Sequence, residues 1–242
     1  MVARIVGTDA VRDNWPARTF MAGLTEQSRH DLLSLGRPRR VPPGRVLITQ
    51  GERRGQVFLL RSGRADITAC VKVTAAAPNG TETLLGIRVG GDIVGELAAL
   101  RDTDRSATVT TCTETIVHRL PGRDFVEFLN ARPEAWQVLC RMLADRLEFA
   151  NQRRLDFAGY PVVNRLARVL LELVGRHGRE VRRGYDLGLG LSQTELGALV
   201  GARLDAVGLA MRELRAAGLV ISGYRSLTVT DIDKLQRFVD LA

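Results

Sequence analysis

Cysteine is scarce in this chain. Its 242 residues include three cysteines, Cys70, Cys112 and Cys140, which lie far apart and form no C-x-x-C pair. An odd number at this spacing indicates neither a disulfide framework nor an iron–sulfur cluster. We therefore expect the cysteines to be small buried hydrophobic residues. The three histidines are equally scattered, so the sequence predicts no metal site.

Long apolar runs are also absent. No stretch is long enough to cross a bilayer, and Arg4, Asp9, Arg12 and Asp13 interrupt the N-terminal segment where a signal peptide would have its apolar centre. Hydrophobic residues make up 45% of the chain and charged residues 26%, as in globular proteins. We expect a cytoplasmic protein with no membrane partner.

Lysine is nearly missing, since Lys72 and Lys234 stand against a large number of arginines. The formal net charge is +8 and the pI is about 10.3, which favours an acidic polymer as a partner. Only a minority of that excess charge lies after Pro161. Charge alone is therefore weak evidence for nucleic-acid binding.

The sequence pattern of the middle of the chain, from Val41 to Leu120, is typical of a β-domain. Short β-branched and aliphatic runs alternate there with Gly, Pro and Asn turns, as in an antiparallel barrel or jelly roll. The runs are 46–48, 57–60, 65–73, 83–89, 107–111 and 115–120. We expect one short helix before them over Phe20–Leu35, opened by Thr25 and Glu26 and closed by Arg37–Arg40, and one after them over Arg123–Leu129.

A long helix is predicted from Pro133, because proline is well tolerated in the first turn. Apolar residues recur along one stripe at helical spacing: Trp136, Leu139, Cys140, Leu143, Leu147, Ala150 and Leu155. The stripe is too long for a small β-roll to cover. A dimer through Pro133–Phe157 explains it most simply, and packing on its own domain is the alternative.

Gly159-Tyr160-Pro161 ends this helix and marks a domain boundary. We expect a helix over Val162–Gly175 and then a flexible charged loop over Arg176–Gly190. Ser192-Gln193-Thr194-Glu195 is a capping box that starts another helix.

Gly201 then permits a turn into a helix over Leu204–Ala217, and a hairpin over 219–229 follows. Helix, glycine turn, helix and hairpin make a winged helix-turn-helix, whose second helix enters the major groove of DNA.

The segment Gly91–Leu100, followed by Arg105-Ser106-Ala107, indicates a pocket for a cyclic nucleotide. The planar guanidinium of arginine can donate two hydrogen bonds to anionic oxygens. Backbone amides at the start of a helix add further donors and the positive end of the helix dipole. Gly95 permits close approach of the backbone, and Glu96 supplies an acceptor that suits a ribose hydroxyl.

These residues resemble the phosphate-binding cassette of cyclic-nucleotide-binding domains, which here stands as Gly95-Glu96-Leu97-Ala98 and Arg105-Ser106-Ala107. The resemblance implies that Glu96 binds the ribose while Arg105 and Ser106 bind the cyclic phosphate. From Trp15 onward, the order of elements resembles the cyclic-AMP receptor protein and fumarate–nitrate regulator family of transcription factors. That implies homodimers that read palindromic operators.

Two departures from the family pattern stand out. The dimer helix offers Ala150-Asn151 where cyclic-AMP responders carry Thr-Ser, so Asn151 is the remaining polar group for a purine. In the reading helix, which is the second helix of the helix-turn-helix and enters the major groove, Leu204 and Leu209 replace two arginines that would pair with guanine. We expect DNA binding with an altered operator preference.

The predicted architecture is α+β, with a β-roll over 15–130, a dimerisation helix over 131–158 and a winged helix-turn-helix over 161–242. The predicted nucleotide-binding residues are Val94, Gly95, Glu96, Leu97, Arg105, Ser106 and Asn151. The predicted DNA-binding residues are Ser192, Gln193, Arg203, Leu204, Asp205, Gly208, Leu209, Arg212 and Arg225.

The expected function is that of a homodimeric transcription regulator that binds double-stranded DNA. The first choice of effector is cyclic AMP, with cyclic GMP and cyclic di-GMP as further choices, and no metal is expected. RNA polymerase is a further candidate partner. One alternative is a nucleotide-sensing module that acts through protein contacts. A second is a sequence-blind DNA-binding dimer without effector. An enzyme is the weakest alternative, because His118 is the one histidine placed to lie inside the β-roll.

Overall fold

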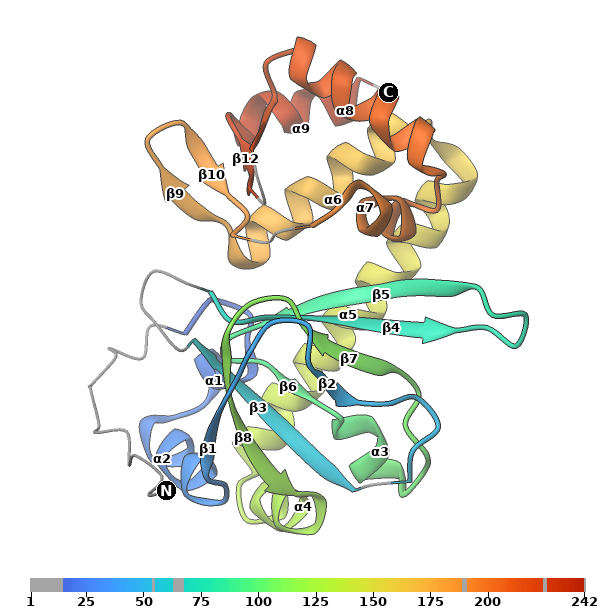
Figure 1. Ribbon diagram of the computed structural model, residues 1–242. Helices are drawn as coiled ribbons and strands as arrows, with labels where there is room; N and C mark the ends of the chain where they lie inside the picture. Colours follow the sequence, from blue (N-terminus) through green and yellow to red (C-terminus); the bar gives the residue numbers. More distant parts are fainter. Residues whose placement is uncertain (1–14, 54, 63–67, 189–190, 224–225, 242) are drawn as a thin grey trace, which may run out of the picture.

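The computed structural model describes residues 15–53, 55–62, 68–188, 191–223 and 226–241. Two four-stranded antiparallel sheets face each other in the N-terminal half and form a β-roll (Figure 1). The first has the order β1 (Pro38–Val41), β8 (Thr115–Pro121), β3 (Gln56–Ser62), β6 (Ile93–Val94). The second has the order β2 (Val46–Ile48), β7 (Thr108–Thr111), β4 (Cys70–Ala76), β5 (Glu82–Val89).

Successive side chains of β3 point alternately to the inside of the roll and to its outer face. Phe58 and Leu60 point into the roll and pack with apolar residues of the second sheet. Val57 and Leu59 point the other way, into a second apolar cluster formed with the flanking helices. This alternation is what a strand buried on both faces requires.

The flanking helices of the roll are α1 (Phe20–Gly23), α2 (Glu26–Ser34), α3 (Glu96–Arg101) and α4 (Gly122–Asn130). The expected single helix over 20–35 is wrong, because the backbone is extended at Leu24 and Thr25. The predicted opening at Thr25 and Glu26 is confirmed for α2, because Thr25 is its N-cap residue and its side chain accepts from the amide of Ser28. The segment 37–40 was predicted only to end this helix, but Pro38–Val41 forms a strand that pairs with β8.

The long helix is α5 (Pro133–Gly159), which runs behind the roll toward the C-terminal half (Figure 1). Leu139 is buried against the roll, as the stripe predicts. Leu147 and Leu155 are uncovered, with 63% and 65% of their surface exposed. The expectation that every cysteine is buried is wrong at Cys140, which is exposed on this helix, whereas Cys70 is fully buried.

The C-terminal half contains α6 (Val162–His177), α7 (Gln193–Val200), α8 (Leu204–Ala216) and α9 (Ile232–Asp240). A small sheet has the order β11 (Val220–Gly223), β12 (Ser226–Val229), β10 (Gly184–Asp186), β9 (Arg179–Val181). The predicted loop over 176–190 is thus wrong where β9 and β10 form. Alternation in so short a segment is too weak to be seen in the sequence, and the strands depend on pairing with β12.

One apolar cluster joins the two halves of the molecule. Leu84 and Val89 of β5 lie in the same cluster as Leu199 of α7 and Leu170 of α6. The outer face of the second sheet is therefore covered by the helices of the C-terminal half, as Figure 1 shows for α7 above β4 and β5.

Candidate nucleotide site and nucleic-acid interface

Gly95 begins the helix of the cassette with a left-handed backbone, φ 85°. A side chain here would be strained by this φ and would also collide with its surroundings. A Cβ would lie 2.6 Å from Nη1 of Arg105 and 2.9 Å from the carbonyl oxygen of Gln56. Glycine is therefore needed at this position for both reasons, and the close approach is that of Arg105.

Arg105 lies almost fully buried, with 4% of its surface exposed. Its Nη1 donates to the carbonyl of Gly95 at 2.7 Å, and its Nη2 donates to the carbonyl of Gln56 at 2.5 Å. Burial lowers the pKa of the guanidinium, and the nearby carboxylates of Glu52 and Glu96 oppose that shift. The two carbonyls hold the guanidinium plane in one orientation, with a fixed positive charge inside the roll.

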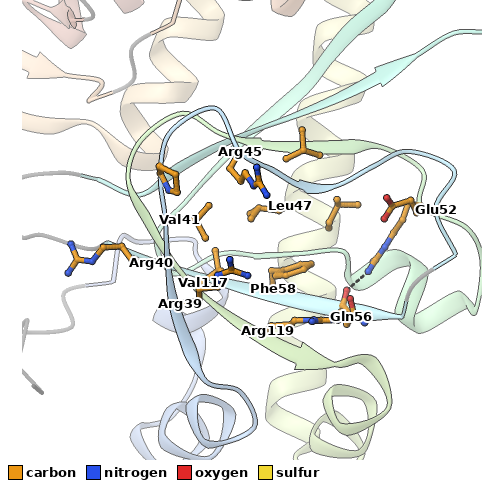
Figure 2. Close-up of a pocket in the computed structure, with 14 residues that line it drawn as sticks. Arg39, Arg40, Val41, Arg45, Leu47, Glu52, Gln56, Phe58, Val117 and Arg119 are labelled. Carbon is orange, nitrogen blue, oxygen red and sulfur yellow. Dashed lines mark hydrogen bonds between the residues drawn. The ribbon is translucent and has the colours of Figure 1, made fainter. Parts of the chain in front are cut away.

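A cavity of about 270 Å³ opens beside Arg105 inside the β-roll (Figure 2). Its apolar wall includes Val41, Phe58 and Val117, which come from three neighbouring strands. Its polar lining is strongly basic and consists of Arg39, Arg40, Arg45, Arg105, Arg119, Gln56 and the single acid Glu52. An apolar wall with a basic lining suits an anion that also carries a flat apolar part.

Glu96 faces a different set of partners. Its carboxylate accepts from Nη1 of Arg146 on α5 at 2.6 Å, and both side chains are buried, at 5% and 13% exposure. Nη2 of Arg146 also reaches the carbonyl of Ile93 at 3.1 Å and the carboxylate of Asp92 at 3.7 Å. This ion pair ties the cassette directly to the long helix.

Arg88 adds a second positive charge to this buried cluster. Burial lowers its pKa to about 9, with Arg146 contributing in the same direction and Asp92 opposing it. Burial likewise raises the pKa of Asp92, against the pull of both arginines. The carboxylates of Asp92 and Glu96 thus lie close to guanidiniums that compensate their charge.

The predicted nucleotide residues do not all meet in one place. Val94 is buried in the interior of the roll and Arg105 lines the cavity. Glu96, Ser106 and Asn151 are not among the residues that line it. Ser106, Asn151 and Leu97 are exposed.

Arg146 is a residue that sequence reasoning missed. It lies off the apolar stripe of the long helix, and only the packing of α5 against the cassette brings it to Glu96. Arg45, which directly precedes β2, and Arg119 of β8 were missed as well, although both strands were predicted. The inward or outward direction of a side chain near a strand end depends on local bulges, and β2 carries one between Val46 and Ile48.

The helix-turn-helix is built from the predicted elements. Ser192 accepts from the amide of Glu195, whose side chain accepts from the amide of Ser192, so the capping box is confirmed. Gly201 has φ 60° and ends α7, and Arg203 is the N-cap residue of α8. Gly208 is buried, and a Cβ there would lie 3.6 Å from Oε1 of Gln193, whereas a Cβ at Gly197 of α7 would lie only 2.6 Å from the carbonyl oxygen of Ala202.

The exposed face of α8 is apolar at two positions. Leu204 and Leu209 expose 52% and 60% of their surface. Asp205 and Arg212 are also exposed on this helix. Arg225, which we predicted to contact DNA, lies outside the described residues.

Two contacts tie the helix-turn-helix to the rest of the chain. Nζ of Lys72 on β4 donates to the Oε1 atom of Glu195 at 2.7 Å. Burial raises the pKa of Glu195, but hydrogen bonds from Lys72 and Ser192 outweigh it and lower the pKa overall. At the other end of α7, Nη1 of Arg153 lies 3.3 Å from the Leu84 carbonyl and 3.5 Å from that of Leu199. The long helix therefore touches both β5 and α7.

Among the described residues, no helix is long and apolar enough to cross a membrane. Within those same parts of the chain, no three His, Cys, Asp or Glu side chains group as a metal site would require.

Comparison with known proteins identifies both halves of the chain. A family model for the cyclic nucleotide-binding domain matches residues 38–132. A second, for the Crp-like helix-turn-helix domain, matches residues 164–238. The chain belongs to the Crp/Fnr family of transcription regulators. This Crp/Fnr regulator is thus a cyclic nucleotide-binding protein with a helix-turn-helix for DNA.

Two related proteins align with most of the sequence of this Crp/Fnr regulator. It is 29% identical over 196 residues to a CRP-like cAMP-activated global transcriptional regulator of Mycobacterium tuberculosis (strain CDC 1551 / Oshkosh), which covers 81% of this chain and 85% of the relative. It is 26% identical to the cyclic AMP receptor protein of Thermus thermophilus, over 88% of this chain and 93% of that protein.

The fold also matches a solved structure. The c-di-GMP responsive global regulator CLP of Xanthomonas campestris superposes with a TM-score of 0.69 at 20% identity, over 86% of this chain and all of that one. This similarity supports the arrangement of β-roll, long helix and helix-turn-helix.

Proposed function

We propose that this protein is a homodimeric transcription regulator, without enzymatic activity, that binds a cyclic mononucleotide beside Arg105 and has an operator preference altered from the family's usual one. The observation that carries the proposal is the buried, rigidly held guanidinium of Arg105 at the edge of a basic cavity. Such a group supplies charge-assisted hydrogen bonds to a phosphate without reorganising when the ligand arrives. Of the two relatives reported above, one is named as a cAMP-activated transcriptional regulator and the other as a cyclic AMP receptor protein.

The size of the cavity favours a mononucleotide over cyclic di-GMP. Its volume of about 270 Å³ lies just below the range of about 300 to 1,000 Å³ in which most small-ligand pockets fall. One base and one cyclic phosphate are a better match to such a space than two of each. We therefore rank cyclic AMP and cyclic GMP ahead of cyclic di-GMP.

The test is an equilibrium titration of the purified protein with cyclic AMP, cyclic GMP and cyclic di-GMP by calorimetry. We expect at least one mononucleotide to bind. Absence of binding by all three at high micromolar concentration contradicts the assignment of the cavity and favours a DNA-binding dimer without effector.

We propose that the signal passes through the long helix. Glu96 is the predicted ribose ligand, but its carboxylate is held by Arg146 of α5 and does not line the cavity, so a contact with the ribose requires Glu96 to turn toward the nucleotide. A ribose hydroxyl that competes for this carboxylate would change the position of Arg146. The same helix carries Arg153, which reaches the last turn of α7. Nucleotide binding would thereby bias the hinge at residues 158–161 and the spacing of the two reading helices.

The exposed apolar residues of α5 lead to a prediction about assembly. Replacing Leu147 and Leu155 with Asp should convert a dimer into a monomer, because charges would face the partner helix in place of apolar side chains. Light scattering checks this against a monomer mass of 26.6 kDa. Leu241→Asp, at a residue that is 90% exposed, is the matched control and should remain dimeric. A wild-type protein that is monomeric at every workable concentration contradicts the proposal.

The leucines of α8 lead to a prediction about DNA. Arg203 and Arg212 can bind phosphates while Leu204 and Leu209 cannot read guanine, so affinity should fall steeply with salt. Discrimination between the family's usual GTGA-type palindrome and scrambled DNA should be small. Replacing both leucines with Arg should increase it by roughly 1 to 3 kcal/mol for each contact that forms.

Fluorescence anisotropy with the two DNA duplexes measures these affinities. Arg212→Ala is the control, since loss of a phosphate contact should weaken both duplexes about equally. Strong selectivity of the wild type for the usual palindrome would refute the argument from α8. If no DNA binds even at low salt, the exposed leucines are better explained by protein contacts, which is the alternative function.

A further inference from the structure

Two cysteines stand opposite each other on adjacent strands. Cys70 is the first residue of β4, and Cys112 directly follows β7. The strands are antiparallel with Val71 opposite Thr111, so Cys70 and Cys112 are the next pair along. The amide of Cys112 donates to the carbonyl of Cys70 at 2.8 Å. Opposite residues in such a pair direct their side chains to the same face, with Cα atoms about 5.5 Å apart.

That spacing is compatible with a disulfide, which typically joins Cα atoms about 4.4 to 6.8 Å apart. Both side chains belong to the apolar cluster on the outer face of the second sheet. The two side chains also lie near enough for a thiol–thiol hydrogen bond to shift the pKa of both. No backbone movement of several ångströms is needed to bring the sulfurs together.

The two thiols differ in reactivity. The hydrogen bond between them is the main reason that the pKa of Cys112 is lowered and that of Cys70 is raised. Burial raises the pKa of Cys70 further, and this residue has no exposed surface. Cys112 is only partly buried. Cys112 is therefore the thiol that an oxidant can reach and the one that ionises more readily, and Cys70 is its buried neighbour.

The pair lies next to the contact between the two halves of the chain. Lys72, two residues along β4 from Cys70, holds Glu195 at the start of α7. Leu199 and Leu196 of α7 belong to the same apolar cluster as the thiols. A covalent change at the two sulfurs would therefore occur at the surface on which the helix-turn-helix rests.

We propose that Cys70 and Cys112 form a thiol oxidation site that hydrogen peroxide converts to an intrachain disulfide. The Cys112 thiolate attacks one peroxide oxygen and breaks the O–O bond, which gives a sulfenic acid and hydroxide. The Cys70 sulfur then attacks the Cys112 sulfur, the S–S bond forms, and the S–OH bond breaks. The departing hydroxide leaves as water with the Cys70 proton. In total, two thiols lose two electrons and one peroxide is reduced to two waters.

The test counts thiols in the full-length protein before and after peroxide. After removal of peroxide, the protein is denatured, labelled with a maleimide and weighed intact by mass spectrometry. We expect three labels in the reduced protein and the loss of two of them after oxidation, with dithiothreitol restoring all three. Before labelling, the oxidised chain should be lighter by two hydrogens.

Cys140→Ser and Cys112→Ser are the matched variants. Cys140 is exposed on α5, so its replacement should leave the disulfide intact. Cys112→Ser removes the attacking thiol at a partly exposed position and should leave Cys70 open to labelling after the same treatment. Three labels on the oxidised wild type overturn the proposal. Peptide mapping that finds Cys140 in the disulfide, or a link between two chains, overturns it equally.

Discussion

Replacing Arg146 with Met is expected to lower the free energy of unfolding by about 3 to 5 kcal/mol. The substitution leaves the carboxylate of Glu96 buried without its 2.6 Å partner, and an uncompensated buried charge costs that much. Asp92 loses part of its compensation as well, since it lies 3.7 Å from the same guanidinium. Urea unfolding followed by circular dichroism measures the change.

Arg123→Met is the matched control for this experiment. Arg123 pairs with Glu127 at 2.9 Å, but both side chains lie largely in solvent, at 88% and 62% exposure. Exposed pairs of this kind contribute about 0.3 to 0.5 kcal/mol. If Arg146→Met changes the stability no more than Arg123→Met does, Glu96 and Arg146 are not the buried pair described above.

Replacing Arg105 with Leu is expected to weaken cyclic nucleotide binding by roughly 2 to 5 kcal/mol, because a buried phosphate loses its charged partner. Calorimetric titration with the nucleotide that the wild type binds measures the loss. Arg105 also holds the carbonyls of Gly95 and Gln56, so the thermal unfolding of the variant is measured alongside. Arg105→Lys keeps the charge without the planar fork and should bind with intermediate affinity.

Arg123→Leu serves as the control for the nucleotide titration, because Arg123 does not line the cavity. Its affinity should equal that of the wild type. An Arg105→Leu protein that is folded and binds nucleotide normally would show that the phosphate lies elsewhere in the chain.

The sequence predicted best those features that depend on local chemistry. The capping box at Ser192 and the left-handed glycine at Gly201 need only neighbouring residues, and the structure contains both. Most strands of the roll were predicted from short apolar runs between turns, but β1 and β6 were not. The role of Gly95 was predicted only in part, because the group that approaches it closely is the guanidinium of Arg105.

Features that depend on packing between distant segments were not predictable. Arg146 pairs with Glu96 across 50 positions of the chain, and nothing in the helical pattern marks it. The Cys70 and Cys112 pair was likewise hidden, because register between strands so far apart is set by the whole sheet. The helix α9 was missed for a different reason. Its sequence does carry a helix signal, since Asp231 is an N-cap residue and Ile232, Leu235, Phe238 and Val239 recur at helical spacing, but that signal was not used.

The most direct test of a nucleotide-responsive regulator is the affinity for DNA with and without nucleotide. Fluorescence anisotropy of one labelled duplex, at one salt concentration, gives the Kd alone and with saturating cyclic AMP or cyclic GMP. Coupling between sites is typically 1 to 3 kcal/mol, so we expect a change of roughly 5- to 150-fold with the nucleotide that binds, and no change in Arg105→Leu. An unchanged Kd in the wild type, with nucleotide demonstrably bound, would contradict the coupling of the β-roll to the helix-turn-helix.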